Sequence, residues 1–299
     1  MPALTPRANQ SIPILRTNAE LTVWRAARER EKVAVHFVPT MGALHAGHGA
    51  LIRAAAGYSG EGAKNGMRAA VLVSIFVNPT QFTEAADLAR YPRTLEADAE
   101  LCLEAGASAV YAPGVEEIYP TGLEVLTPAL PRVATAPRLE DAVRPGHFAG
   151  VCQVVARLFD LARPARAFFG EKDWQQLQVV RALEKGRGNR VEIVAVETVR
   201  EGSGLALSSR NRFLGGEERG RAEGISRALT MGAGAGDVEG AEGALRRELE
   251  RAGLEIQYAV VRDAETLEAL GSGVRVGRML IAVKVGGVRL IDNMRWERV

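Results

Sequence analysis

Lysine is scarce in this chain of 299 residues, whose 38 basic side chains are mostly arginine and stand against 36 acidic ones. The formal net charge of +2 gives no electrostatic reason to expect a nucleic acid as a partner. Because lysine is not general surface filler here, a lysine next to a predicted site carries more information than usual. The lysines are Lys32, Lys64, Lys172, Lys185 and Lys284.

Cysteine and long apolar runs are also nearly absent. Cys102 and Cys152 both fall in segments of helical composition, so we expect two buried thiols in a reducing compartment. The N-terminus, MPALTPRANQ, contains no apolar signal core. The longest apolar stretch, residues 69–77, is interrupted by Ser74 and is too short to span a bilayer. We predict a cytoplasmic protein that does not enter a membrane.

Several common catalytic and nucleotide-binding motifs are missing. The sequence contains no Walker A lysine motif and no G-x-S-x-G elbow, and His147 suggests no catalytic triad. The glycine-rich run GAGAGDVEG (232–240) does not follow a predicted strand, so it is not a dinucleotide fingerprint. If the protein uses ATP, another segment must bind it.

Residues 39–51, PTMGALHAGHGAL, are the best candidate for that segment. They follow an apolar run (33–38) and precede a helical segment, which predicts a strand, a glycine turn and a helix that begins near Ala46. The first N–H groups of a helix have no internal partner, so this junction can bind an anion. Gly42 and Gly47 allow close backbone approach, and His45 and His48 share one face of the first turn.

Two interpretations of this turn are open from the residues alone. A polyphosphate site suits two imidazoles beside free N–H groups, whereas a metal site would need a third ligand that no neighbouring Cys or carboxylate supplies. The alternative is an ordinary capped helix with incidental histidines.

Strands and helices alternate as far as residue 199. We expect strands over 33–38, 69–77, 109–113, 167–170 and 191–196, and helices over 20–32, 46–57, 95–105, 150–163 and 171–185. Residues 1–18 are a loose lead-in, 59–66 a surface loop, and 114–146 a long loop that is functional or holds short strands. This alternation predicts an α/β fold with a Rossmann-like, doubly wound parallel sheet over residues 1–199.

The pattern changes after residue 200. A helical background covers 215–253, and strands are expected over 256–261, 278–285 and 288–291, the last two joined by a tight turn at Gly286 and Gly287. We therefore predict a smaller C-terminal α+β domain over residues 200–299.

Polar residues follow three of the predicted parallel strands: His45 and His48, then Asn78 and Gln81, then Lys172, Asp173 and Gln176. Because parallel strands end at one edge of a sheet, we expect these residues to form a single site. Lys172 could balance phosphate charge there, or could simply form a surface ion pair. Arg210, after Ser208 and Ser209, could clamp a phosphate, although Ser-Ser-Arg-Asn is also ordinary loop chemistry.

The turn H-A-G-H resembles the H-x-G-H signature of class I nucleotidyl-transferring enzymes, and the longer string PTMGALHAGH resembles the pantothenate synthetase (pantoate–β-alanine ligase) family. Class I enzymes combine this turn with a later, mobile Ser/Lys/Arg loop. The resemblance extends over nearly the whole chain, through VSIFVNPTQF (73–82), YPRT (91–94), RPGHF (144–148), FGEKDWQQ (169–176), TVREGSGLALSSRN (198–211) and RLIDN (289–293).

The resemblance implies an ATP-dependent ligase that condenses (R)-pantoate with β-alanine to pantothenate, a coenzyme A precursor. The reaction would pass through a pantoyl adenylate and release AMP and pyrophosphate. It also implies Mg²⁺, whose ligands stay unassigned, and a homodimer.

The resemblance implies roles for individual residues as well. His48 would be the proton donor of adenylation, with His45, Lys172 and Arg210 as the other catalytic residues. Gln81 and Gln176 would bind pantoate, Gln81 would also contact β-alanine, and Asn78 would support them. The implied ATP-binding residues are Met41, Gly42, Ala43, Leu44, His45, Ala46, Gly47, His48, Gly170, Glu171, Lys172, Asp173, Val199, Leu207, Ser208, Ser209 and Arg210.

The sequence departs from the family pattern near Gly49, Thr83 and Ala149, which predicts a looser helix start and altered substrate affinity with the same reaction. Three other functions are alternatives: a nucleotidyltransferase that releases a dinucleotide, a tRNA-charging enzyme, and a non-catalytic nucleotide-binding regulator. The charge balance and the lack of a basic anticodon domain disfavour the tRNA-charging enzyme.

Overall fold

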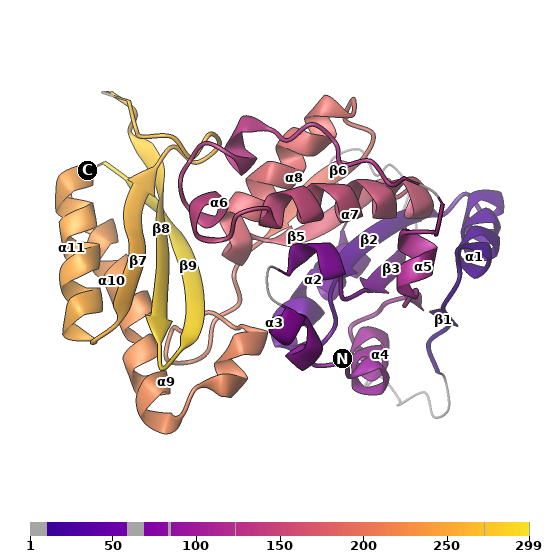
Figure 1. Cartoon of the computed structure of the whole chain (residues 1–299), viewed down its shortest axis with the longest axis horizontal. Helices are drawn as coiled ribbons and strands as arrows, with labels where there is room; N and C mark the ends of the chain where they lie inside the picture. The colour runs from indigo at the N-terminus through magenta and orange to yellow at the C-terminus, as the bar shows by residue number, and fades with distance from the viewer. Residues whose placement is uncertain (1–10, 59–68, 83–84, 123, 272, 299) are drawn as a thin grey trace, which may run out of the picture.

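The computed structural model describes residues 11–58, 69–82, 85–122, 124–271 and 273–298. Two β-sheets lie next to each other along the long axis of the molecule (Figure 1). The expected loop 59–66 and the departure at Thr83 lie outside the described residues. No helix in the described ranges is long and apolar enough to cross a membrane.

The larger sheet is parallel, with strand order β1-β4-β3-β2-β5-β6. The chain builds outward from β2 through β3 and β4, then crosses to the other side of β2 for β5 and β6. The order therefore reverses between β2 and β5, and ligands of open α/β sheets bind at the carboxyl edge of such a switch point. The strands are β1 (Ile14–Leu15), β2 (Ala34–Thr40), β3 (Ala69–Ile75), β4 (Ala109–Tyr111), β5 (Arg166–Gly170) and β6 (Glu192–Val196).

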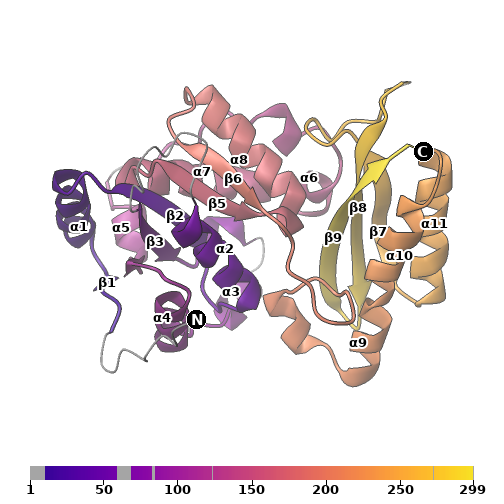
Figure 2. The ribbon, with the colours of Figure 1, turned by 180° about the vertical axis from the view of Figure 1, so that it is seen from behind.

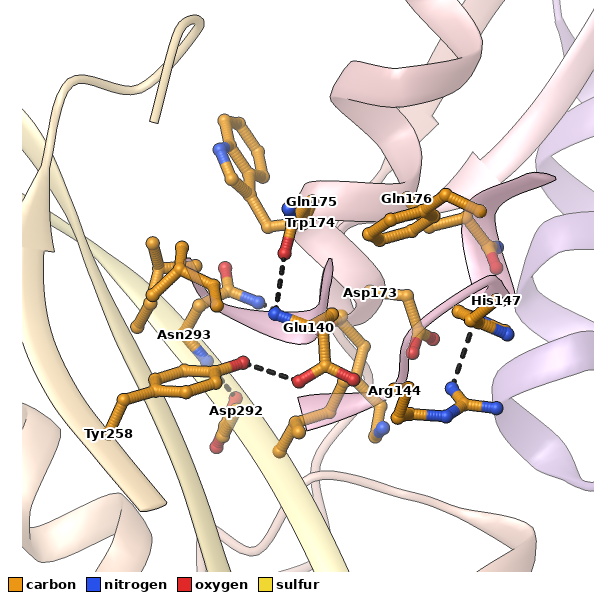
Figure 3. Close-up of a pocket in the computed structure, with 15 residues that line it drawn as sticks. Glu140, Arg144, His147, Asp173, Trp174, Gln175, Gln176, Tyr258, Asp292 and Asn293 are labelled. Carbon is orange, nitrogen blue, oxygen red and sulfur yellow. Dashed lines mark hydrogen bonds between the residues drawn. The ribbon is translucent and has the colours of Figure 1, made fainter. Parts of the chain in front are cut away.

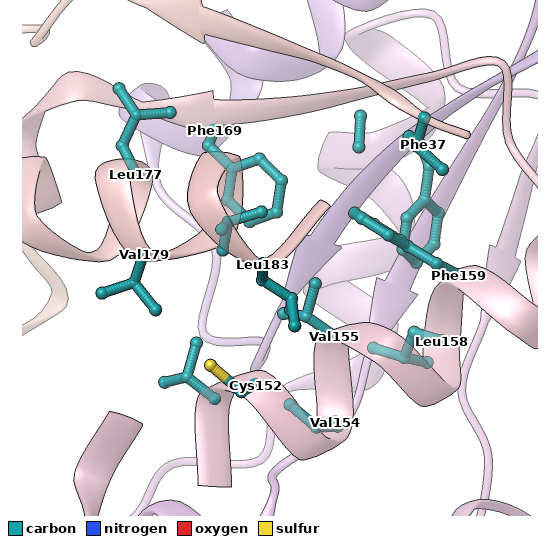
Figure 4. Close-up of a cluster of buried hydrophobic side chains, with 14 of the residues drawn as sticks. Phe37, Cys152, Val154, Val155, Leu158, Phe159, Phe169, Leu177, Val179 and Leu183 are labelled. Carbon is teal, nitrogen blue, oxygen red and sulfur yellow. The ribbon is translucent and has the colours of Figure 1, made fainter. Parts of the chain in front are cut away.

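Helices cover both faces of this sheet, because the central strands are apolar on both sides. On one face Phe37 of β2 packs edge-on against Phe159 of α7, 6.3 Å between ring centroids, in a cluster that includes Phe169 (Figure 4). The next residue, Val38, points to the other face and packs in a cluster with Ile52 of α2. Alternate side chains of one strand thus enter two separate cores.

The helices that precede residue 200 are α1 (Asn18–Arg30), α2 (Ala46–Gly57), α3 (Ala85–Arg90), α4 (Leu95–Glu104), α5 (Val115–Ile118), α6 (Glu140–Val143), α7 (His147–Ala162) and α8 (Trp174–Gly186). Short 3₁₀ turns are η1 (Pro79–Gln81), η2 (Arg132–Ala134), η3 (Glu171–Asp173) and, later, η4 (Ser209–Phe213). Cys102 in α4 and Cys152 in α7 are free and buried, as expected.

The smaller sheet is antiparallel, with order β7-β8-β9 (Glu255–Arg262, Val276–Val285 and Val288–Glu297). Gly286 and Gly287 have φ of +55° and +81°, which suits the two-residue turn predicted there. Helices α10 (Gly224–Ala233) and α11 (Val238–Arg251) cover its outer face, and α9 (Gly216–Ala222) lies at one end (Figure 2). The inner face contributes Val260 and Leu280 to the core of the larger sheet.

The predicted fold class, a doubly wound parallel sheet with a small antiparallel one after it, is confirmed, but several local expectations were wrong. The supposed lead-in contains β1, whose two residues pair with β4, and the start of α1. Residues 114–146 hold short helices instead of strands. Helix α7 begins at His147, and 171–173 form a 3₁₀ turn before α8. Such short elements depend on long-range contacts that no local pattern reveals.

Candidate active site

The turn between β2 and α2 is held in shape by a carboxylate from another helix. Gly42 (φ +83°) and Ala43 (φ +51°) both have left-handed backbone conformations. Buried Asp98 of α4 accepts hydrogen bonds from the N–H groups of Ala43 (2.9 Å) and Leu44 (2.8 Å). A Cβ at position 42 would lie 3.0 Å from Ile75 and 3.1 Å from Asp98, so close approach as well as φ favours glycine there.

His45 and His48 cap the start of α2 reciprocally. Nδ1 of His45 accepts from the Gly47 N–H (3.1 Å), and Nδ1 of His48 accepts from the His45 N–H (3.3 Å). An accepting imidazole nitrogen carries no proton, so each neutral ring keeps its proton on Nε2. Helix α2 begins at Ala46, as predicted, with this cap formed.

The two imidazoles are neutral at pH 7. Burial, together with the nearby His45, lowers the pKa of His48 to about 3. Burial likewise lowers the pKa of His45, with Lys172 as the next contribution. The ring centroids are 4.2 Å apart, so two Nε2–H donors lie together at a helix N-terminus. They can donate hydrogen bonds to an anion, but its charge must be balanced by other side chains.

Asn78 organises the polar turn that follows β3. Its Oδ1 accepts from the hydroxyls of Tyr119 (2.8 Å) and Thr80 (3.1 Å), and its Nδ2 donates to the Gly150 carbonyl (3.2 Å). A Cβ on Gly150 would lie only 2.4 Å from the Thr80 carbonyl oxygen, so α7 can approach this turn only through a glycine. Buried Asn78 is thus engaged within the protein, and it positions the half-buried Gln81 at the end of η1.

Lys172 lies on η3, and side chains of the C-terminal sheet bind the backbone of this turn. Asn293 of β9 donates to the carbonyls of Glu171 (2.9 Å) and Lys172 (2.8 Å). Arg278 of β8 forms an ion pair with Glu171 (2.9 Å) and donates through Nε to Asn293 Oδ1 (2.6 Å). The backbone of η3 is therefore fixed by side chains from the other sheet.

Asp173 is an ionised carboxylate within a cluster of cations. Burial alone would raise its pKa, but the positive charges of Lys172, Arg210 and Arg144 outweigh that effect, so its pKa is lowered. Of these cations Lys172 also lowers the pKa of His45, so it lies near the histidine turn and supplies positive charge that the neutral imidazoles lack.

One pocket gathers several of the predicted residues between the two sheets (Figure 3). Lys172, Asp173 and Gln176 line it together with Arg144 and His147. The complete lining is Leu139, Glu140, Arg144, His147, Phe148, Lys172, Asp173, Trp174, Gln175, Gln176, Tyr258, Leu280, Ile291, Asp292 and Asn293.

The segment that carries Arg210 runs past the histidine turn. The Leu207 N–H donates to the Val199 carbonyl (2.9 Å), and a Cβ on Gly47 would lie 3.8 Å from Leu207 Cβ. Ser208 Oγ accepts from the Arg210 N–H (3.2 Å) and starts η4. The Arg210 side chain is exposed, so of the predicted cations it is the one least enclosed by the protein.

Sequence reasoning assigned no role to Asp98, Arg278, Asn293, Arg144 or His147. Asp98 lies within an ordinary helix, and no local pattern marks it. Arg144, His147 and Asn293 carry a partial signal, because they fall in the strings RPGHF and RLIDN, but a string does not reveal its partners in space.

The fold and this arrangement define a class: a nucleotide-binding α/β enzyme whose H-x-G-H turn lies at the switch point of a parallel sheet. Comparisons with known proteins narrow the class. Residues 13–295 match the family model described as pantoate-beta-alanine ligase. The pantothenate synthetase of a Nocardioides species is 48% identical in an alignment of 297 positions, and the match covers 95% of this chain and 85% of that protein. The pantothenate synthetase of Rubrobacter xylanophilus is 47% identical in an alignment of 286 positions, and the match covers 90% of this chain and 92% of that protein.

Solved structures of the same family also match this fold. The crystal structure of pantothenate synthetase from Thermus thermophilus has a TM-score of 0.83 at 44% identity and covers 95% of this chain and 99% of that one. A Francisella tularensis pantoate-beta-alanine ligase, described as complexed with beta-gamma ATP and beta-alanine, has a TM-score of 0.74 at 31% identity, covering 95% and 97%. The chain belongs to the pantoate–β-alanine ligase family, and it is an acid–amine ligase that forms pantothenate.

Proposed function

We propose that the described residues make pantothenate in two steps at the switch point of the parallel sheet. First, the carboxylate of (R)-pantoate attacks the α-phosphorus of ATP, which gives pantoyl adenylate and releases pyrophosphate. Then the amine of β-alanine attacks the acyl carbon of the adenylate, which gives pantothenate and AMP. The observation that carries this proposal is the pair of neutral Nε2–H imidazoles at the start of α2, beside Lys172 and Asp173.

Adenylation is needed because an amine does not displace oxide from a free carboxylate. The mixed anhydride replaces oxide with a phosphate, which is a stable leaving group. The task of the protein in this step is to position the reactants and to neutralise charge around phosphorus. His45 and His48 would donate hydrogen bonds to phosphate oxygens, and Lys172 and Arg210 would supply positive charge as pyrophosphate departs.

The predicted nucleotide site follows the elements just described. The turn 41–48 would bind the triphosphate through backbone N–H groups and the two imidazoles. Segments 170–173 and 207–210, with Val199, would complete the site. A bound triphosphate brings negative charge next to His48, which raises its pKa toward the range where it can donate a proton.

Pantoate would bind through Gln81 and Gln176, because a neutral amide can bond both a hydroxyl and a carboxylate oxygen without adding charge. Asn78 would act behind them, since its own amide is already engaged within the protein. Gln81 would also contact β-alanine.

Mg²⁺ fits the residues present only together with the nucleotide. Among the described residues no group of three or more His, Cys, Asp or Glu side chains could hold a metal ion. Magnesium is usually held by one or two carboxylates plus substrate phosphates, and Asp173 is an ionised carboxylate in the site. Asp173 would hold the ion, which would neutralise part of the triphosphate charge.

We further propose a division near residue 199, with the C-terminal part acting as a lid over the sheet. In the second step the lid segment 208–210 would exclude water, which would otherwise hydrolyse the adenylate. The proposal includes a homodimeric enzyme in the cytoplasm, where thiols such as the two buried cysteines stay reduced.

Omission of β-alanine tests the proposed sequence of steps. The protein, incubated with ATP, Mg²⁺ and pantoate, should accumulate pantoyl adenylate, detected by mass spectrometry, and should release pyrophosphate only when pantoate is present. A nucleotide-binding regulator would release none. A nucleotidyltransferase would form a dinucleotide instead, and either result would contradict the proposal.

A further inference from the structure

Arg144 is a largely enclosed guanidinium that forms no ion pair with a carboxylate in the described part of the chain. It lies just before α7 and lines the pocket between the sheets (Figure 3). Two carboxylates precede it closely in sequence, and both have other partners. Asp141 accepts hydrogen bonds from the N–H groups of Arg138 (3.1 Å) and Leu139 (2.9 Å). Glu140 is taken by Arg289, with Nη–O distances of 2.8 and 2.5 Å, and by the Tyr258 hydroxyl at 2.6 Å. Arg144 helps to lower the pKa of the neighbouring Asp173, but less than Lys172 and Arg210 do, and within the described residues the two side chains form no ion pair. The guanidinium of Arg144 is therefore available to bind an anionic group of a ligand.

His147 fixes the direction of this guanidinium. Its Nε2 accepts a hydrogen bond from Arg144 Nη1 (3.0 Å), so the ring proton lies on Nδ1, which donates to the Gln81 carbonyl (3.4 Å). This tautomer is the opposite of the one in His45 and His48. Burial, together with the charge of Arg144, lowers the pKa of His147 to about 4, so the ring stays neutral and its Nε2 continues to accept.

The hydrogen bond to His147 uses one of the five N–H donors of the Arg144 side chain. The others can still form the two-pronged contact that arginine makes with a carboxylate. The sixteen-residue helix α7 also begins at His147, and its dipole adds positive potential at this end. The pocket wall here thus combines a fixed guanidinium, a helix N-terminus and Gln176.

We infer that Arg144, oriented by His147, binds the carboxylate of the amine substrate, a short ω-amino acid. This inference rests on the proposed function. The phosphates and pantoate already have their own partners there, whereas the carboxylate of β-alanine has none. Its amine and carboxylate lie about 4–5 Å apart. One imidazole ring separates Gln81, which would contact β-alanine, from Arg144. An amine held at the acyl carbon would thus place its carboxylate within reach of the guanidinium.

The two half-reactions allow a direct test with Arg144→Gln and Arg144→Lys. We expect Arg144→Gln to raise the KM for β-alanine roughly 10- to 100-fold, as loss of charge-assisted hydrogen bonds does. Pantoate-dependent pyrophosphate release without β-alanine should stay within about twofold of the unmodified protein, which also shows that the variant is folded. Arg144→Lys keeps the positive charge but not the paired donors of the guanidinium. Its KM for β-alanine should lie between those of the unmodified protein and of Arg144→Gln.

A second amine makes the assignment specific to the carboxylate. β-Alaninamide has the same amine and chain but no negative charge, so the unmodified enzyme should strongly prefer β-alanine. Arg144→Gln should lose most of that preference. Arg132→Gln is the matched control, because Arg132 forms an exposed ion pair with Glu268 outside the pocket. This variant should change neither the KM for β-alanine nor the preference for β-alanine over β-alaninamide.

Two outcomes would overturn the inference. Arg144→Gln could keep the KM and the acid-over-amide preference, in which case another group binds the carboxylate. It could instead abolish pyrophosphate release, which would assign Arg144 to ATP or pantoate. If the unmodified protein releases no pyrophosphate with pantoate, the proposed function itself fails, and that result is distinct from both.

Discussion

At the scale of single residues, protonation is decided by burial and by backbone partners. His45 and His48 accept N–H donors at Nδ1, while His147 accepts from Arg144 at Nε2. Histidines of the same intrinsic chemistry thus present opposite nitrogens to their surroundings. Because burial depresses their pKa values, the site in its ligand-free form uses them as neutral hydrogen-bonding groups.

His48→Ala should lower the rate of adenylation by about 10²–10⁴-fold, the usual effect of removing a positioned acid or an oxyanion donor. The rate is measured as pantoate-dependent pyrophosphate release. His36→Gln is the control: His36 is a buried histidine whose Nδ1 contacts the Ala55 carbonyl (2.7 Å) far from the turn, and the variant should retain the rate. An unchanged rate in His48→Ala would remove this residue from the mechanism.

The pKa of His48 also predicts how stability depends on pH. Its folded value of about 3 lies below the ordinary 6.5, so between these values the unfolded chain binds a proton that the folded one does not. The contribution of neutral His48 to the free energy of unfolding is therefore complete above about pH 6.5, and it is lost as the pH falls toward 3. The Tm of ligand-free His48→Gln should fall less between pH 6.5 and about 4 than that of the unmodified protein, as measured by calorimetry. Equal slopes would show that His48 is not buried in this way.

At the scale of elements, the anion site is a junction of several strand ends and one helix. The turn after β2 depends on α4, because Asp98 accepts hydrogen bonds from the N–H groups of Ala43, whose backbone is left-handed, and of the next residue, Leu44. The turn after β3 depends on α7 through Asn78 and Gly150. Neither turn would hold its shape by local preference alone.

Asp98→Asn should weaken ATP binding about 10-fold, because an amide can replace only part of the acceptor capacity of the carboxylate and its NH₂ group would face an N–H. Isothermal titration calorimetry measures the effect. Asp160→Asn, which loosens an ion pair with Arg187 at the surface, is the matched control and should bind ATP normally. If both variants bind ATP alike, Asp98 does not organise the nucleotide turn.

At the scale of the whole molecule, polar contacts join the two sheets next to the site. Arg289 and Tyr258 of the small sheet donate hydrogen bonds to the Glu140 carboxylate. Arg278 lies over the Trp174 ring, with its Cζ 3.6 Å from the ring centroid. Buried ion pairs are costly to desolvate, so these contacts are better understood as fixing one relative arrangement than as a large source of stability. Asn293 is the member of this interface that touches the backbone of Lys172.

Asn293→Asp should reduce the adenylation rate at least about 10-fold, since the near-isosteric carboxylate loses both donors and faces the carbonyls of Glu171 and Lys172. Steady-state kinetics should show the loss in kcat more than in the KM for ATP, because Lys172 would act mainly on the departing pyrophosphate. Arg132→Ala removes a contact between the same two parts of the molecule, but at the exposed rim, and should be neutral. Equal losses in both variants would indicate general loosening of the interface.

The sequence by itself determined the α/β alternation, the strand–turn–helix at residues 39–51 and the family, because these depend on periodicity, turn residues and contiguous strings. Only the tertiary structure decided which groups complete the site. Asp98 reaches Ala43 across 55 residues of chain, and Asn293 reaches Glu171 across 122. Such contacts form when crossover connections and sheet packing bring distant segments together, and no local pattern encodes them. Burial follows from the same packing, and so does the neutral state of His48. The same packing leaves the charge of Arg144 without a carboxylate partner in the described part of the chain.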